Sequence, residues 1–300
     1  MTRRRLRCTP AADLGRALRM FGGLSLALGL LGVWGALRLQ AATPDRDNWV
    51  EPMKKVHARF TGKPGTFAQF GDSISVSRAF WFGLQYDRKN SPPDMAKAYE
   101  IVRRHMLPAC WDWKGSQYGS DGGMTIRWAH ENVDKWLDKL QPEVALIMFG
   151  TNDLGPLELA EYAAKTREVV QKCLDRGTVV ILSTIPPKHG QVKKAAEFAE
   201  AVRRIAREMK VPLCDYHAEI VKRRPDDWDG ALPKFKDVPG DEYNVPTLIS
   251  RDGVHPSNPR KNAGDFSEEA LRSNGYGLRS YLTLLGYAEV IQKALGPKRD

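Results

Sequence analysis

From about residue 65 onward, short runs of apolar residues alternate with longer amphipathic stretches, and this alternation limits the fold more than any other feature. Each run has four to six residues rich in branched or aromatic side chains, which predicts strands that are buried on both faces. The runs span residues 66–70, 144–149, 178–183 and 211–214. Strands of this kind belong to a sheet with helices on both faces, so the pattern predicts an α/β fold.

Helices are expected between these strands, because apolar residues recur there at helical spacing. In residues 125–140 the apolar side chains fall on one stripe, which is typical of a face packed on a core. The expected helices span residues 95–106, 125–140, 157–174, 195–209 and 278–295. Residues 110–123 and 224–244 lack periodicity and are expected to be long loops. No internal repeat or Pro/Ser-rich linker divides the chain, which favours one domain over residues 65–296.

The first 42 residues are typical of an export leader. Six arginines precede an apolar run of 17 residues, 21–37, and small residues follow it near position 42. The alternative is an uncleaved membrane anchor through residues 21–37, because that run is at the short end of what a spanning helix needs. We expect an exported protein that is periplasmic, extracellular or anchored facing outward, with residues 43–64 as a linker or lead-in to the domain.

The formal net charge of +10 comes largely from this leader. Seven of the 46 basic residues and one of the 36 acidic residues lie in residues 1–42, which leaves +4 for the rest. The remaining basic clusters are scattered and lack interleaved aromatic residues, so nucleic acid is not an expected partner. The four cysteines, at positions 8, 110, 173 and 214, contain no C-x-x-C pair, and they predict neither a metal site nor a disulfide framework.

In parallel sheets, catalytic and ligand-binding residues lie at the carboxyl ends of the strands. Three segments of the chain place polar residues at such positions. Ser73 follows the first strand, at the start of a helix whose free N–H groups favour negative charge. Asn152 follows the second expected strand and offers an amide donor. Asp252 precedes His255 by three positions, so one loop can supply a base and the carboxylate that orients it.

These segments resemble the blocks of the SGNH (GDSL-like) hydrolase superfamily. GDSIS at 71–75 resembles the first block, GTND at 150–153 the third and DGVHP at 252–256 the fifth, in the same order and spacing. GDSxS alone would be a weak signal, but its combination with the other two is strong. The resemblance covers residues 65–295 and implies a three-layer α/β/α sandwich with a central parallel sheet, the flavodoxin-like SGNH hydrolase fold.

The resemblance also implies a role for each matching residue. Ser73 would be the nucleophile of a serine esterase, with Asp252 and His255 completing its triad. The oxyanion hole would consist of the Ser73 N–H, the Gly123 N–H and the Asn152 side chain. The second block is the least specific match, and Gly122 remains the alternative to Gly123. This chemistry requires no metal and no organic cofactor.

The substrate is expected to be a small-molecule or glycan ester. Aromatic residues in the two long loops could stack on sugar rings, or could simply pack the loops down; they are Trp111, Trp113, Tyr118 and Trp228. With export, they favour deacetylation of an extracytoplasmic glycan. The alternatives on the same triad are a lipid acyl hydrolase of lipase or lysophospholipase type and an O-acyltransferase.

Two further classes of protein place similar residues at strand ends. A metallophosphoesterase would carry a D-x-H segment near the first strand and a GNH[DE] segment, and the sequence has neither a D-x-H at that place nor a GNH[DE] run. A non-catalytic envelope binding module is disfavoured, because every position of the triad is filled.

Overall fold

The computed structural model describes residues 47–296, and the leader expected in residues 1–42 lies outside them. The strands are β1 (Phe67–Gly71), β2 (Val144–Met148), β3 (Val179–Ser183) and β4 (Leu213–Cys214). The helices are α1 (Val50–His57), α2 (Ser73–Val76), α3 (Pro93–His105), α4 (Ile126–Leu140), α5 (Leu159–Asp175), α6 (Val192–Met209), α7 (Tyr216–Arg223), α8 (Glu268–Leu271) and α9 (Gly275–Val290).

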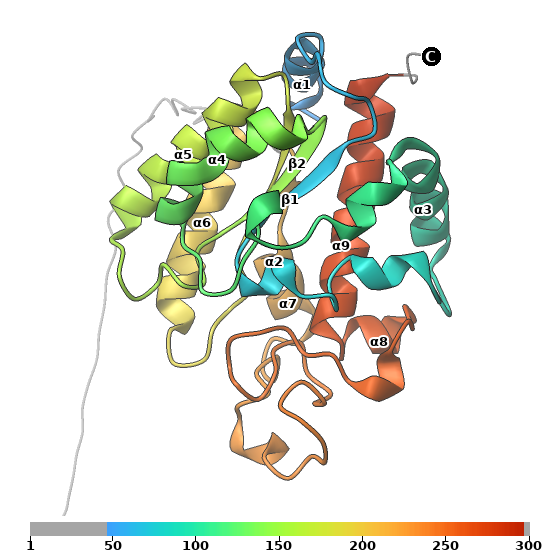
Figure 1. The fold of residues 1–300 in the computed structure, drawn as a ribbon. Coiled ribbons are helices and arrows are strands. Elements are labelled where there is room, and N and C mark those ends of the chain that lie inside the picture. Colours follow the sequence, from blue (N-terminus) through green and yellow to red (C-terminus); the bar gives the residue numbers. More distant parts are fainter. Residues whose placement is uncertain (1–46, 297–300) are drawn as a thin grey trace, which may run out of the picture. The chain divides into compact units, whose positions relative to one another are not determined.

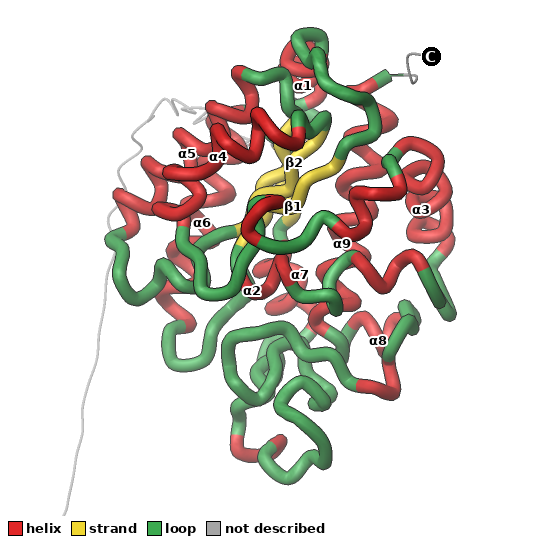
Figure 2. The backbone as a smooth tube through the Cα atoms, in the orientation of Figure 1, coloured by secondary structure: helices red, strands yellow, loops and turns green. Residues whose placement is uncertain are grey.

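The four strands form a parallel sheet in the order β1-β2-β3-β4, drawn in yellow in Figure 2. Phe67 pairs with Val144, and Val144 pairs with Val179, so the first three strands begin in register. Every side chain of these three strands is buried. The structure therefore confirms the α/β fold with a central parallel sheet flanked by helices.

Helices α4, α5 and α6 each connect one strand to the next. Because the strand order follows the chain, right-handed crossovers place all three helices on the same face of the sheet. Figure 1 shows them together on one side, with α9 on the other side and α3 packed against α9. The stripe expected in α4 faces the core, where Val133 and Leu137 are almost fully buried.

The segment before β1 differs from the expected linker, because it contains α1. Trp49, Met53 and Val56 are buried in the main core, so this segment belongs to the packed structure. Its apolar residues are few and the helix is short, so the sequence pattern gave little signal there.

The two expected long loops contain little regular secondary structure. Residues 108–118 contain two short 3₁₀ turns, and Ser120 then makes a parallel bridge to Gly71 at the end of β1. The loops after α7 lie beyond the carboxyl ends of the strands, near α2 (Figure 2).

The cysteines at 110, 173 and 214 are buried free thiols. Among residues 47–296, no helix has the length and apolar character needed to cross a membrane.

Candidate active site

Strand β1 brings Ser73 to the carboxyl edge of the sheet through a tight turn. Asp72 is the N-cap of α2, and its carboxylate accepts a hydrogen bond from the Ile74 N–H at 3.0 Å. A Cβ atom at Gly71 would lie 2.0 Å from the Ser75 Oγ, so only glycine fits there. Ser73 is therefore the first residue of a helix whose leading N–H groups lack partners within the helix.

Ser73, His255 and Asp252 lie along one series of hydrogen bonds. The Ser73 Oγ lies 2.8 Å from the His255 Nε2, although 182 positions separate the two residues. The other ring nitrogen, Nδ1, lies 2.6 Å from the Asp252 Oδ2. This is the geometry of a hydroxyl beside a base whose ring is oriented by a carboxylate.

The loop that carries Asp252 and His255 is held by the Asp252 side chain. Its Oδ1 accepts hydrogen bonds from the Ser250 Oγ at 2.6 Å and from the backbone N–H groups of Val254 at 2.8 Å and His255 at 2.9 Å. The Ser250 N–H donates to the His255 carbonyl at 2.8 Å and closes the loop. The carboxylate and the imidazole consequently keep a fixed relation.

These contacts set the charge state of the pair. Burial raises the pKa of Asp252, but the hydrogen bonds from His255 and Ser250 outweigh it and hold that pKa well below its usual range. The hydrogen bond that His255 donates to Asp252 raises the pKa of His255 above its usual value, and burial offsets only part of this rise. The imidazole is therefore a stronger base than a free histidine.

Two buried carboxyl groups border these residues. Burial raises the pKa of Asp72 to about 6, and burial together with the charge of Asp72 raises that of Asp153 to about 7. Each carboxyl group accepts one N–H at a helix start, Ile74 in α2 and Ile126 in α4 at 2.9 Å. Both groups thus position the segments next to the expected site.

The expected oxyanion glycine follows a segment that runs beside the end of β1. The Gly71 N–H donates to the Gly119 carbonyl at 3.0 Å, and the Asp121 N–H donates to the Gly71 carbonyl at 3.2 Å. The Gly122 N–H is engaged by the Asp121 carboxylate at 2.8 Å, whereas the Gly123 N–H has no acceptor among residues 47–296. The geometry favours Gly123 over Gly122 as the free donor.

Asn152 lies in the turn that follows β2 and is partly exposed. Its Nδ2 donates to the Met124 carbonyl at 3.0 Å, which uses one of the two N–H bonds of the amide. Met124 directly follows Gly123, so this bond links the two segments that carry the expected donors. The second N–H of the amide remains for a ligand.

A cavity of about 410 Å³ lies beside Ser73 and His255. Its lining includes Asp241, Tyr243, Asn258, Arg260 and Tyr276. These side chains present carboxylate, hydroxyl, amide and guanidinium groups, and apolar surface makes up the rest of the walls. No motif in the sequence marks these residues. Most of them could be suspected only because they lie near Asp252 and His255 in the sequence.

The four aromatic residues expected to contact substrate do not line this cavity. Trp111 and Trp228 are only 7% and 8% exposed, and Trp111 stacks on Trp81 with ring centroids 5.2 Å apart. The prediction that these two residues offer a face to a sugar is wrong, because protein atoms cover them. Trp113 and Tyr118 stack on each other at 5.9 Å and pack against the core.

A second histidine lies next to the triad loop. The backbone N–H of His189 donates to the Gly253 carbonyl at 2.8 Å, and the Nδ1 of the His189 ring lies 2.5 Å from the Asp229 Oδ2. The ring is about half exposed while Asp229 is nearly buried. Asp229 is 40 positions away from His189 in the sequence, so no short motif signals this pair.

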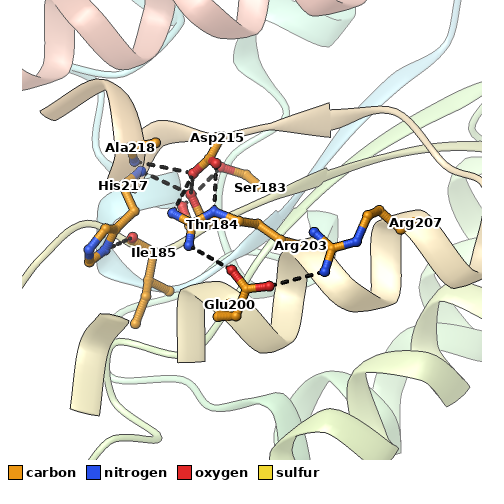
Figure 3. A network of polar contacts seen from close by, with 9 residues as sticks. All are labelled: Ser183, Thr184, Ile185, Glu200, Arg203, Arg207, Asp215, His217 and Ala218. Carbon is orange, nitrogen blue, oxygen red and sulfur yellow. Dashed lines mark hydrogen bonds and ion pairs between the residues drawn. The ribbon is translucent and has the colours of Figure 1, made fainter. Parts of the chain in front are cut away.

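A separate polar network fixes the ends of β3 and β4 (Figure 3). Arg203 of α6 donates to both carboxylate oxygens of Asp215, at 2.6 and 3.0 Å. Asp215 also accepts hydrogen bonds from the Thr184 hydroxyl at 3.0 Å and from the Ala218 N–H at 3.1 Å. None of these residues lines the cavity at Ser73, so the network joins secondary-structure elements.

Comparison with known families gives one match. Residues 70–259 match the model of the GDSL-like Lipase/Acylhydrolase family, and this range includes all of the residues expected to form the triad and the oxyanion hole. No curated protein matches the chain.

Several solved structures are similar to the chain at low sequence identity. A lipase/acylhydrolase from Enterococcus faecalis is 16% identical, with 78% of this chain and 98% of that chain covered and a TM-score of 0.47. The psychrotrophic esterase EstA from Pseudoalteromonas sp. is 15% identical, with coverages of 76% and 99% and a TM-score of 0.47. A mutant of Axe2, an acetyl-xylooligosaccharide esterase from Geobacillus stearothermophilus, is 16% identical, with coverages of 80% and 99% and a TM-score of 0.43.

Proposed function

Because this chain belongs to the GDSL-like lipase/acylhydrolase family, we propose that Ser73, His255 and Asp252 are its catalytic triad. As a member of that family the protein is a carboxylic ester hydrolase. The observation that carries the assignment is the continuous contact from the Ser73 Oγ through both ring nitrogens of His255 to the Asp252 carboxylate. A hydroxyl in this setting can be deprotonated as it attacks.

The reaction proceeds in two halves. His255 Nε2 accepts the Ser73 proton while the serine oxygen bonds to the ester carbonyl carbon, and the imidazolium then gives that proton to the departing alcohol. Water then attacks the carbonyl carbon of the acyl-enzyme while His255 accepts a proton from it. The bond between this carbon and the Ser73 oxygen breaks, the Ser73 oxygen regains the proton from His255, and the carboxylic acid leaves. Asp252 holds the tautomer and stabilises the imidazolium in both halves.

The negative oxygen of each tetrahedral intermediate is bound by three donors, the Ser73 N–H, the Gly123 N–H and the Asn152 amide. Support comes from the unengaged Gly123 N–H and from the Asn152 bond to Met124, which keeps the two loops together. In comparable sites each such donor lowers the barrier by about 3 kcal/mol.

The natural substrate that we propose is an acetyl ester on a glycan. The cavity beside Ser73 is lined by Asp241, Asn258 and Arg260 as well as two tyrosines, and such groups can satisfy the hydroxyls of a sugar. A long acyl chain could form no hydrogen bond with these groups, whereas a sugar offers several hydroxyls to them. The support therefore comes from this lining and no longer from the tryptophans of the long loops.

We also propose that the enzyme acts outside the cytoplasm, on the strength of the leader pattern in residues 1–42. That segment lies outside the described residues. Mass spectrometry of the mature N-terminus tests the proposal: a start near Thr43 indicates an exported, cleaved protein, and an intact leader indicates the anchor through residues 21–37.

Covalent labelling tests the nucleophile. A fluorophosphonate probe should label the wild-type chain on Ser73 and should fail to label Ser73→Ala, with the modified peptide identified by mass spectrometry. Ser91→Ala, whose hydroxyl bonds to the Arg88 carbonyl, is a matched control that should label like wild type. Full labelling of Ser73→Ala would refute the assignment.

Substrate preference is tested with two series. Release of acetate from acetylated xylo- or chito-oligosaccharides should exceed hydrolysis of long-chain nitrophenyl esters at equal concentration. A preference for long chains would favour a lipid acyl hydrolase instead. Transfer of acetyl to an added sugar in excess of free acetate would identify an O-acyltransferase on the same triad.

A further inference from the structure

Two cationic side chains contact the helix that carries Ser73. Arg279, from α9, is only 1% exposed, and Lys114, from the loop before the expected oxyanion glycine, is partly buried. The Arg279 guanidinium carbon lies 3.6 Å from the centre of the Phe80 ring, and the Lys114 Nζ lies 4.8 Å from it. Both cations thus contact one aromatic ring, which lies seven positions after Ser73.

Both cations donate to carbonyl groups that the helix cannot satisfy by itself. Helix α2 ends at Val76, because Ser77 turns to an extended conformation with ψ of 132°. The carbonyls of Ile74 and Ser75 therefore have no backbone donor among the described residues. Arg279 Nη1 donates to the Ile74 carbonyl at 2.7 Å, and Lys114 Nζ donates to the Ser75 carbonyl at 2.6 Å.

The same cations fasten the helix to the strand before it. Arg279 Nη2 donates at 2.8 Å to the Ser75 Oγ, the hydroxyl that occupies the space left by the missing side chain of Gly71. Lys114 Nζ also donates to the Gln69 Oε1 in β1 at 2.8 Å. Four hydrogen bonds thus surround the residues on either side of Ser73.

Such an arrangement is expensive for the fold. Burial lowers the pKa of Arg279 and of Lys114, and among residues 47–296 neither cation has a carboxylate within ion-pair distance. Asp72 supplies an opposing charge to Arg279 only at longer range. An apolar side chain at either position would fill the space at lower cost in desolvation, so packing alone does not explain the cations.

We infer that Arg279 and Lys114 are positioning residues for the nucleophile: they replace the missing backbone donors of α2 and fix the direction of the Ser73 hydroxyl and N–H. This inference rests on the proposed function of Ser73. The hydroxyl must point at His255 and the N–H at the oxyanion, and displacement of a reacting group by about 1 Å can lower a rate about 100-fold.

The test compares variants by kinetics and by labelling. Arg279→Met removes the donors but keeps most of the volume, and Arg279→Lys restores a cation that can reach the Ile74 carbonyl. For a short nitrophenyl ester, Arg279→Met should lower kcat by about 10- to 100-fold with little change in KM, and should slow fluorophosphonate labelling by a similar factor. Arg279→Lys should recover much of both rates, and Lys114→Met should resemble Arg279→Met.

Arg203→Met is the matched control. Arg203 also makes buried polar contacts, but in the network between α6 and α7 shown in Figure 3. It should lower the unfolding temperature while kcat per folded molecule stays near wild type. Thermal unfolding of every variant measures the folded fraction, so a loss of activity that only follows a loss of folded protein would overturn the inference.

The outcomes separate this inference from the proposed function. Wild-type protein that labels on Ser73, together with Arg279→Met and Lys114→Met that label equally fast, would overturn the positioning role and leave the nucleophile intact. Wild-type protein that does not label on Ser73 would overturn the nucleophile and the positioning role together.

Discussion

A single carboxylate, Asp252, controls both the orientation and the basicity of His255. Its Oδ2 contacts the imidazole Nδ1, and its Oδ1 closes the loop through Ser250 and Val254. Because the contact raises the pKa of His255, the neutral imidazole needed for proton abstraction becomes the dominant form at a higher pH than for a free histidine. The pH dependence of the reaction therefore reports on this one hydrogen bond.

Asp252→Asn is expected to lower kcat by about 10³- to 10⁴-fold, because an amide favours the wrong imidazole tautomer. As the pH is lowered, the residual activity of this variant should also begin to fall at a lower pH than that of the wild type, because the group that raises the pKa of His255 is gone. Measurement of kcat/KM against pH checks both effects. Asp229→Asn, which breaks the neighbouring pair with His189, is the control, and an equal shift of its pH dependence would contradict the assignment.

The two adjacent glycines of the oxyanion segment can be distinguished by one methyl group each. A Cβ at either position would meet no atom within 4 Å, but Gly123 has a φ of +73° and Gly122 has no positive φ. Gly123→Ala carries a backbone cost of about 1 to 2 kcal/mol and should lower kcat about tenfold. Gly122→Ala should stay near wild type. The reverse order in steady-state kinetics would assign the oxyanion donor to Gly122.

The sequence could predict the residues of the site that occur in short segments. Asp252 and His255 are three positions apart, and Ser73 follows the Gly71-Asp72 turn at the end of an apolar run, so local pattern was sufficient. Arg279 could not be found this way, because its role depends on a contact 205 positions away with Ile74. The tryptophans misled because an aromatic residue in a loop can stack on a ligand or pack inward, and only coordinates distinguish the two.

At the level of helices and strands, one buried carboxylate connects α1, α3 and the segment before β1 to the start of β2. Glu143, just before β2, accepts hydrogen bonds from the His57 Nε2 of α1 at 2.9 Å, the His105 Nε2 of α3 at 2.8 Å and the Gly65 N–H at 2.6 Å. Burial raises its pKa, but the hydrogen bonds from His105 and His57 outweigh burial and lower it to about 2. Its negative charge is thus a structural requirement.

This carboxylate should make stability depend on pH. The folded pKa lies below the usual value of 4.5, so the contribution of Glu143 is fully present above pH 4.5 and is lost as the pH falls toward 2. The shift corresponds to about 3 kcal/mol of unfolding free energy at neutral pH. Urea unfolding should show Glu143→Gln to be less stable than wild type at pH 7, with a smaller difference near pH 3. Glu100→Gln, on the exposed face of α3, is the control.

The sequence predicted the elements with strong periodicity and missed the short ones. β1, β2 and β3 lie within one residue of the expected runs, because continuous apolar segments have no alternative to burial. α1 and α7 each have only eight residues, and two turns of helix give too few repeats of a 3.6-residue period to recognise. Strand β4 has two residues and is shorter than the expected run, because it lies at the edge of the sheet and pairs with β3 alone.

At the scale of the whole described region, the site depends on both ends of it. Ser73 lies after the first strand, His255 in a late loop and Arg279 in the last long helix, so the hydroxyl, the base and the positioning cation meet only after nearly all of residues 47–296 have packed. α1 lies at the far end of the sheet from Ser73 and contributes no side chain to the cavity. It still supplies Met53 and Val56 to the common core.

Two truncated chains should therefore behave differently. A chain that begins at Thr43 keeps α1 and should retain the kcat of the full chain on a soluble short ester, because every site residue lies after position 70. A chain that begins at Arg59 loses the buried Trp49, Met53 and Val56 and the His57 bond to Glu143, and should unfold at a temperature lower by several degrees or fail to accumulate. Equal melting temperatures for the two chains would show that α1 is the linker that the sequence pattern indicated, and a loss of kcat in the Thr43 chain would show that the first 42 residues take part in catalysis.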